Sequence, residues 1–362
     1  MFQFRLASAF VAAVLLGACG SASNPNPAAA DVLFAVVENG SPNQPGTVAI
    51  VGLDGKARAT ADFQPRIGPV IPDAYAPVQG VAHVVGSGVY YIDGTGTVRV
   101  LRVGSEPQIV ARFPLQPAQE DAWFAVSPDG SRVLAGILTF PALGPVITGT
   151  SWNSLVGPTT FDLKAAQRGG GTTTLVHWET PIQFPRGGTG PTAIFPIGWT
   201  ATGPVAMLPD YLTSQNAWPG GPLYVIADSG KQTNQLGGSD CYSASIARGG
   251  LIPCISGQAV TVRDQGGSVI WTAHVDGFSA LSLYLAPDGQ AISDGLRVET
   301  RNAGMVAMPK NFLVEGWLDN DTVVGRPIVD DANTGNLAWI SLSDPATVHD
   351  LGFNGDFVST VG

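Results

Sequence analysis

The chain has 362 residues, of which only 13% are charged and 44% are hydrophobic, and its formal net charge is −10. This acidic balance, without a concentrated basic patch, argues against a nucleic-acid partner and against docking of the protein surface on anionic lipid. The 46 glycines and 28 prolines, with no long stretch of helical periodicity, favour many short strands separated by turns.

The N-terminus has the composition of a secretory signal. Arg5 is its only charge, and residues 6–16 form an apolar run that is shorter than the roughly 20 residues needed to span a bilayer as a helix. The sequence Leu-Gly-Ala at residues 16–18 precedes Cys19 and resembles the lipobox of bacterial lipoproteins. The resemblance implies cleavage before Cys19 and lipidation of its thiol. An ordinary signal peptide followed by a chance cysteine is the alternative.

Residues 20–30 contain no large apolar side chain. Such a segment cannot bury a core, so we expect an extended, mobile spacer between the lipid and the fold. The expected organisation is a signal peptide over residues 1–18, a lipidated tether over 19–30 and one domain over 31–362. The lipobox resemblance implies the cell envelope as location. This is the outer face of the cell membrane, or the outer membrane or periplasm of a bacterium with two membranes.

A unit of four short strands recurs through the mature chain. We place seven copies at about residues 32–63, 78–113, 121–178, 192–236, 242–273, 279–308 and 312–351. Units of this kind arranged in a ring form an all-β, seven-bladed propeller. Six or eight blades are the alternatives, because boundaries drawn from sequence drift by several residues.

The first unit has three evident strands, at residues 32–37, 47–51 and 57–63. A fourth strand is expected from residues 356–361 at the other end of the chain, paired with residues 32–37 as the innermost strand. Its alternation predicts Phe357, Ser359 and Val361 on one face. Strands from both termini would then close the ring and remove the open edge of the sheet.

The clearest repeat is a Pro-Asp-Gly turn between two apolar runs, where Pro fixes φ and Gly accepts a positive φ. It occurs as Ser-Pro-Asp-Gly at residues 127–130 and as Ala-Pro-Asp-Gly at residues 286–289. Through these turns the chain resembles the TolB-like and WD40-like bacterial propellers, which implies a propeller of the cell envelope.

A second and looser resemblance is to quinoprotein-type propellers and to the outer-membrane assembly lipoprotein built on them. Residues 264–271 and 331–339 each form a turn followed by a strand that ends in a tryptophan, Trp271 and Trp339. In that family this tryptophan docks against the next blade, which the resemblance implies for this chain.

Cys241 and Cys254 are the cysteines that remain when Cys19 is lipidated. Two thiols in an oxidising compartment favour a disulfide, while a metal pair or two free buried thiols are the alternatives. Simple hairpin register around residues 248–250 sets Cys254 opposite Ala244. The chain before that point must therefore curl back to bring the sulfurs together.

Motifs for nucleophilic or metal catalysis are missing from the sequence. We interpret the four histidines, His83, His177, His274 and His349, as structural groups of the blades. A ring of inward His or Glu that binds a metal in the channel, as in lactonase-like propellers, is the alternative. Residues 330–336 partly resemble a calcium loop, but an Asx-rich hairpin turn is favoured. No metal and no cofactor is assigned.

Four long connections are expected on one rim of the ring, at about residues 64–77, 138–156, 179–191 and 209–221. Large aromatic side chains on adjacent loops are typical of binding surfaces. The candidate ligand-binding residues are Tyr75, Phe140, Trp152, Phe184, Arg186, Tyr211 and Trp218, with Arg66 and Asp210 beside them. Loops that fold over one another and bury their own aromatics are the alternative.

Two hypotheses of function follow. The first is a non-enzymatic binding or scaffold protein that is held at the membrane by lipid and presents this rim to a protein, peptide or glycan. The second is an enzyme with its centre at the channel mouth, either a metal-dependent hydrolase or a quinone-dependent dehydrogenase. The missing catalytic motifs favour the first.

Overall fold

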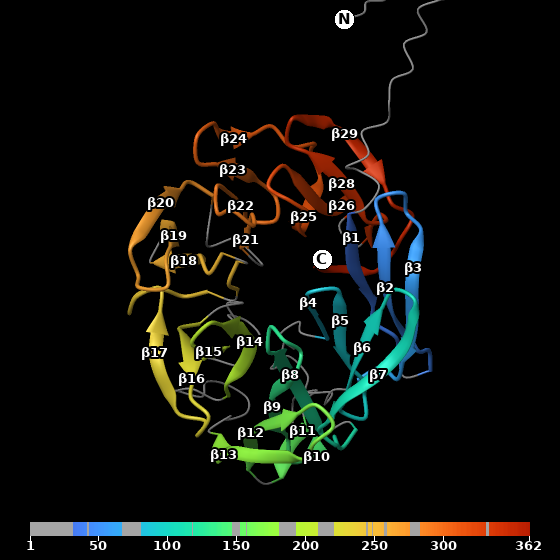
Figure 1. The fold of residues 1–362 in the computed structure, drawn as a ribbon, viewed down its shortest axis with the longest axis vertical. Helices are drawn as coiled ribbons and strands as arrows, with labels where there is room; N and C mark the ends of the chain where they lie inside the picture. Colours follow the sequence, from blue (N-terminus) through green and yellow to red (C-terminus); the bar gives the residue numbers. More distant parts are fainter. Residues whose placement is uncertain are drawn as a thin grey trace, which may run out of the picture.

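The computed structural model describes residues 32–41, 43–66, 81–117, 119–146, 153–156, 158–180, 193–208, 221–243, 245–247, 249–256, 259–275, 283–330 and 333–362. Their regular structure is entirely β, with seven blade sheets set around one axis and one separate two-stranded sheet (Figure 1). The predicted seven-bladed propeller is therefore confirmed. None of these residues belongs to a helix that could cross a bilayer.

The first four blades each have four strands, named from the innermost outward. Blade 1 contains β30 (Asp356–Val361), β1 (Leu33–Glu38), β2 (Gly46–Gly52) and β3 (Ala57–Phe63). Blade 2 contains β4 (Ala82–Val85), β5 (Gly88–Ile92), β6 (Thr97–Arg102) and β7 (Ser105–Arg112). Blade 3 contains β8 (Glu120–Val126), β9 (Arg132–Thr139), β12 (Thr159–Gln167) and β13 (Thr172–Thr180), with a separate hairpin of β10 (Ala142–Val146) and β11 (Asn153–Val156). Blade 4 contains β14 (Phe195–Thr200), β15 (Gly203–Met207), β16 (Leu223–Ile226) and β17 (Gln232–Leu236).

The last three blades complete the ring. Blade 5 contains β18 (Ile252–Ser256), β19 (Ala259–Arg263) and β20 (Val269–Ala273). Blade 6 contains β21 (Tyr284–Leu285), β22 (Ala291–Ser293), β23 (Val298–Thr300) and β24 (Gly304–Val306). Blade 7 contains β25 (Phe312–Trp317), β26 (Thr322–Asp330), β28 (Ala338–Ser341) and β29 (Asp344–Asp350), and β27 (Asn333–Thr334) pairs with the end of β26.

The core lies between neighbouring blades, because successive side chains of a strand point to opposite faces of its sheet. In β5, Tyr90 packs between blades 2 and 3, whereas Val89 and Tyr91 pack between blades 1 and 2. All five residues of this strand are buried. The strands therefore look like continuous apolar runs in the sequence, as strands buried on both faces do.

Both termini contribute to blade 1, as predicted. β30 pairs antiparallel with β1, with Leu33 opposite Val361 and Val37 opposite Asp356. In Figure 1 the first strands (blue) and the last strands (red) lie side by side. The inner edge of β1 is thus covered, and the ring is closed by hydrogen bonds within one sheet.

The predicted faces of β30 are wrong. The register shifts between Ala35 and Val36, so the pairing passes over Val358. Phe357 packs between blades 1 and 7, whereas Val358 and Val361 pack between blades 1 and 2. A β-bulge adds one residue to one strand and so inverts the alternation beyond it.

Arg326 holds β30 against blade 7. It is 6% exposed, and its guanidinium contacts Glu315 of β25 and the Gly355 carbonyl and lies 3.1 Å from Asp356. The backbone N–H of Phe357 donates to the other oxygen of Glu315 at 3.2 Å. A buried guanidinium and two partly exposed carboxylates therefore join the closing strand to the two inner strands of the neighbouring blade.

The Pro-Asp-Gly turns form as predicted, with positive φ of 69° at Gly130 and 73° at Gly289. Asp129 accepts hydrogen bonds from the hydroxyls of Ser127 and Ser131, at 2.6 and 2.7 Å. These bonds lower the pKa of Asp129 to about 2. The short polar residues thus organise the turn through their own side chains.

The implied tryptophan docking is present at Trp271, whose Nε1 donates to the carbonyl of Gly289 on blade 6 at 2.9 Å. Trp339 packs between blades 7 and 1. Its ring also stacks on His349, with the ring centroids 3.8 Å apart. Both tryptophans therefore contribute to contacts between adjacent blades.

Blade 5 departs from the expected four strands. The described residues of its inner segment make isolated bridges, Tyr242 with Ile255 and Ser243 with Gly221. The hydroxyl of Ser243 donates to the carbonyl of Ser245 at 3.1 Å and accepts from the N–H of the same residue at 3.3 Å. This local bonding competes with strand pairing, so the chain curves where a regular inner strand was expected.

Candidate functional site

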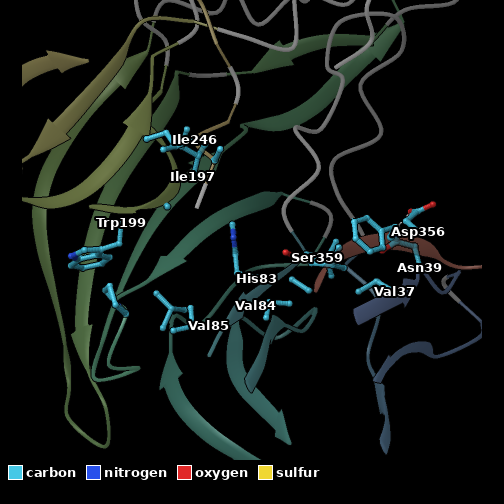
Figure 2. Close-up of a pocket in the computed structure, with 18 residues that line it drawn as sticks. Val37, Asn39, His83, Val84, Val85, Ile197, Trp199, Ile246, Asp356 and Ser359 are labelled. Atoms are coloured by element: carbon cyan, nitrogen blue, oxygen red, sulfur yellow. Dashed lines mark hydrogen bonds between the residues drawn. The ribbon is translucent and has the colours of Figure 1, made fainter. Parts of the chain in front are cut away.

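The inner strands of the propeller enclose a channel of about 530 Å³. It is lined by β30, β4 and β14, by the end of β8 and by Ile246 and Ala247 of blade 5. Figure 2 shows these side chains converging from separate blades around one space. A pocket of this size is in the range that holds a small organic ligand, roughly 300–1,000 Å³.

The channel wall is largely aliphatic. Valines come from β1, β4, β8 and β30, and isoleucines from β14 and blade 5. The polar or aromatic exceptions are Asn39, His83, Trp199, Asp356, Phe357 and Ser359. The described residues that line the channel include no lysine or arginine. Polar atoms, those of the backbone included, nevertheless form nearly as much of the channel surface as apolar atoms do. The channel therefore offers hydrogen-bonding groups as well as apolar contacts.

Asp356 and Asn39 lie at one end of the channel. Asn39 follows the end of β1 and Asp356 begins β30, so both lie at the rim where β3 ends and β4 begins. The amide of Asn39 donates to Asp356 at 3.3 Å, and Arg326 lies 3.1 Å from the same carboxylate. The carboxylate is therefore already paired inside the protein.

His83 is the titratable group inside the channel. It lies on β4 opposite Tyr90 of β5, and its ring meets the edge of Phe124 with 4.9 Å between centroids and 88° between planes. Burial lowers the pKa of His83 to about 4, against the opposing effect of a hydrogen bond to the Phe124 backbone. The imidazole is therefore neutral at physiological pH.

One ring nitrogen of His83 has no hydrogen-bond partner. This atom, Nε2, is buried. The sequence favours a satisfied structural group at His83, whereas the structure shows that this side chain is half satisfied.

Trp199 stands on the opposite side of the channel from Asp356 (Figure 2). The Arg132 guanidinium lies 5.5 Å from the centroid of its ring, and Arg132 also pairs with Asp228. A cation over an indole face is a favourable contact. Arg132 of blade 3 thus holds the ring of Trp199, which borders the channel from blade 4.

Phe140 and Arg66, the two residues of the predicted binding rim that the structure describes, do not lie on a binding surface. Phe140 is 2% exposed and belongs to the core of blades 3 and 4, because it follows β9 directly and continues its buried face. Arg66 pairs with Asp121 at 2.9 Å and donates to the Ala122 carbonyl, so it braces blade 3. These two side chains are structural and not surface groups.

The other predicted binding residues lie outside the described residues. These are Tyr75, Trp152, Phe184, Arg186, Asp210, Tyr211 and Trp218, and the same holds for Cys19. The strands that flank them, however, fix where their connections emerge. β3, β9, β13 and β15 all end at the rim where Asn39 and Asp356 lie.

Cys241 and Cys254 form a disulfide with 4.9 Å between their Cα atoms. Both are fully buried in the core that joins blades 3 to 5. Tyr242 pairs with Ile255, which sets Cys254 opposite Ser243 and not opposite Ala244. The one-residue difference and the turn from Gly238 to Cys241 bring the sulfurs together.

The segment that partly resembles a calcium loop is a hairpin in its backbone, as favoured, with Asp330 opposite Asn333. Across the described ranges, no three His, Cys, Asp or Glu side chains gather in a way that could hold a metal ion. His177 instead pairs with Asp162 at 2.6 Å and His274 with Glu299 at 2.8 Å. The His177 pair lies within blade 3, and the His274 pair joins blades 5 and 6. None of these four residues lines the channel.

Comparison with known proteins finds likeness in fold alone. No family model matches the chain, and no curated protein matches its sequence. An oligogalacturonate lyase from Vibrio parahaemolyticus is 7% identical over 81% of this chain and 87% of its own, with a TM-score of 0.45. A protein of unknown function from Desulfotomaculum acetoxidans is 11% identical over 90% and 98%, with a TM-score of 0.46. One from Bacteroides caccae is 12% identical over 91% and 98%, with a TM-score of 0.43. The TolB-like and quinoprotein resemblances therefore remain predictions.

Proposed function

We propose that this protein is a non-enzymatic binding protein of the cell envelope, anchored by lipid on Cys19, and that its binding site is the central channel. The observation that carries the proposal is the channel of about 530 Å³, walled by aliphatic side chains and bordered by a few polar groups. Concave, mostly apolar sites with sparse polar groups are where proteins hold small ligands or chain segments.

The polar groups of the channel support binding more than catalysis. General acid–base catalysis works best when the pKa of the catalytic group lies near the working pH. The pKa of His83 is lowered to about 4, which makes it a weak base at neutral pH. Asp356, the carboxylate at the channel mouth, is already paired with Arg326. These groups suit recognition of a ligand.

The topology supports access from one rim of the ring. The long connections between β3 and β4 and between β13 and β14 emerge at the rim where Asn39 and Asp356 border the channel. In the proposal, a glycan, peptide or protein segment of the envelope reaches the channel from this rim. The lipid and the spacer at residues 20–30 would hold the propeller near the membrane where such ligands occur.

Two glycines offer a matched test of the channel. A Cβ built on Gly198, which lines the channel, or on Gly171, in the turn before β13, meets no atom within 4 Å. Gly198→Leu therefore puts a side chain into the channel, and Gly171→Leu puts the same side chain on the outside. Envelope extract is passed over immobilised wild type and both variants, and retained glycans, peptides and proteins are identified by mass spectrometry.

The expected result is one compound retained by wild type and Gly171→Leu and lost by Gly198→Leu. Equal retention by all three proteins would show that the channel is not the site. Chemical conversion of the retained compound by the wild type would favour the enzyme hypothesis. Anchoring is tested separately, since Cys19→Ser should leave the propeller folded and move it from the membrane to the soluble fraction.

A further inference from the structure

The charge along the channel has one sign. Asp356 is the only Asp, Glu, Lys or Arg among the described residues that line it. The side chain of Asp356 is 51% exposed, and Asn39 beside it is exposed as well. Figure 2 shows the two side chains together on one side of the space. A ligand that enters at this mouth can therefore reach the carboxylate directly.

Arg326 does not cancel the negative charge at the mouth. Its buried guanidinium pairs with Glu315 and with Asp356, so one positive and two negative charges leave this group with a net charge of −1. Glu315 is the more deeply buried of the two carboxylates, and Asp356 faces the channel mouth. The whole chain is acidic too, with a formal net charge of −10. The mouth therefore attracts a cation and repels an anion.

The carboxylate of Asp356 has room for another donor. One oxygen accepts from the Asn39 amide at 3.3 Å, and the other accepts from Arg326 at 3.1 Å. A carboxylate offers about four lone-pair sites, so a ligand N–H fits without displacing either bond. An ammonium group carries a compact charge and three donors. Its hydrogen bonds to a carboxylate are of the strong, charge-assisted kind.

Away from the mouth, the side chains of the channel are apolar. Val85 and Val126 lie at the ends of β4 and β8, Trp199 lies near the end of β14, and Ile246 comes from blade 5. These side chains lie in the same space as Asp356. An aliphatic group placed against them is removed from water, which favours binding. The channel thus complements a molecule with a positive charge at one end and an apolar part at the other.

We propose that the channel selects an organic cation, whose primary ammonium group binds Asp356 and whose aliphatic part lies along the valine and isoleucine wall. This inference rests on the proposed binding function and names the ligand class of that site. The ammonium group can belong to a small amine or to a lysine of a peptide segment. The two sources share this chemistry and are distinguished by the experiment.

The test uses the full-length chain with Cys19→Ser, labelled with ¹³C at the isoleucine δ1 methyl groups. Ile197 and Ile246 line the channel and report binding inside it. Ile109, which is 41% exposed on β7, is the control outside it. Hexylammonium, hexanol and hexanoate are titrated as a series that differs in charge. A short acetylated and amidated peptide of valines with one lysine is compared with its glutamine counterpart.

Hexylammonium should bind about fivefold more tightly than hexanol, and hexanoate should bind more weakly than hexanol. The signals of Ile197 and Ile246 should shift and that of Ile109 should not. High salt should reduce the preference, because it screens the charge of a half-exposed carboxylate. A preference for the cation in the hexyl series alone assigns a small amine, and a preference for the lysine peptide assigns a peptide segment. The proposal is overturned if neither cation is preferred, or if the preferred cation leaves Ile197 and Ile246 unshifted.

Two matched variants locate the charge that is recognised. Asp356→Asn should abolish the preference for the cation and leave the affinity for hexanol unchanged. Asp344→Asn removes an exposed carboxylate of β29 that does not line the channel, and it should keep the preference. The comparison of ligands on the wild-type propeller decides the proposal even if Asp356→Asn does not fold. If Gly198→Leu abolishes retention from the extract while neither cation is preferred, the proposed function stands and this inference fails.

Discussion

The guanidinium of Arg326 lies 3.1 Å from the carboxylate of Asp356, although 30 residues separate them in the chain. Arg326 belongs to the second strand of blade 7, and Asp356 begins the closing strand of blade 1. The contact therefore crosses the point at which the ring is closed. It makes the stability of the propeller depend on the last residues of the chain.

Deletion of residues 353–362 should lower the free energy of unfolding by several kcal/mol. The deletion removes β30, leaves the inner edge of β1 unpaired and exposes Phe34 and Val36, which are at most 3% exposed. Denaturant unfolding measures the loss, with deletion of Gly362 alone as the control. A truncated protein whose melting temperature stays within about 2 °C of the full chain would contradict the closure.

Arg326→Met should destabilise the protein by about 3–5 kcal/mol, because it leaves Glu315 and Asp356 without their buried cation. The control is Arg58→Met, which breaks the exposed pair with Asp54 and should change stability by less than about 1 kcal/mol. Equal effects of the two variants in urea unfolding would show that the buried network does not hold the closing strand.

Gly130→Ala should destabilise the protein more than Gly104→Ala. Both glycines have a positive φ, of 69° and 76°, so each variant carries backbone strain of about 1–2 kcal/mol. A Cβ at Gly130 would also lie 2.1 Å from the Tyr90 hydroxyl, whereas at Gly104 it meets nothing. Tyr90→Phe in the Gly130→Ala background should restore part of the difference in melting temperature, and no restoration would contradict the clash.

These features differ in how far the sequence could reveal them. The Pro-Asp-Gly turns are local, since Ser127, Asp129 and Gly130 organise the turn by themselves, and they were predicted correctly. The closing strand was predicted from its apolar alternation and from the strand missing in blade 1. The bulge beside Val358 could not be predicted in this way, because it depends on the register of the paired strand β1, which lies more than 300 residues away in the chain.

The site was harder to predict than the fold. His83 has no local motif, and its role depends on Phe124 and on which nitrogen remains unpaired, which only the packing of blades 2 and 3 decides. Phe140 is a candidate ligand-binding residue in the sequence because it lies in a long connection, with burial of the loop aromatics as the alternative, yet it continues the buried face of β9. Sequence position shows that a residue lies near a loop, while burial is decided by the neighbouring blade.

The pH dependence of stability should report the burial of His83. Its folded pKa, about 4, lies below the ordinary value of 6.5, so below pH 6.5 the unfolded state binds a proton that the folded state does not. Stability is therefore complete above pH 6.5 and falls as the pH approaches 4, by about 3 kcal/mol for this group. His83→Phe should flatten that part of the profile. An unchanged profile would mean that His83 titrates normally.

The central claim is that the channel is the binding site, and calorimetry tests it most directly. The compound retained from the envelope extract is titrated into wild type, Gly171→Leu and Gly198→Leu, whose melting temperatures are compared first. We predict equal affinity for wild type and Gly171→Leu and at least about tenfold weaker binding by a folded Gly198→Leu. Equal affinity of all three proteins would contradict the claim and show that the binding site lies outside the channel.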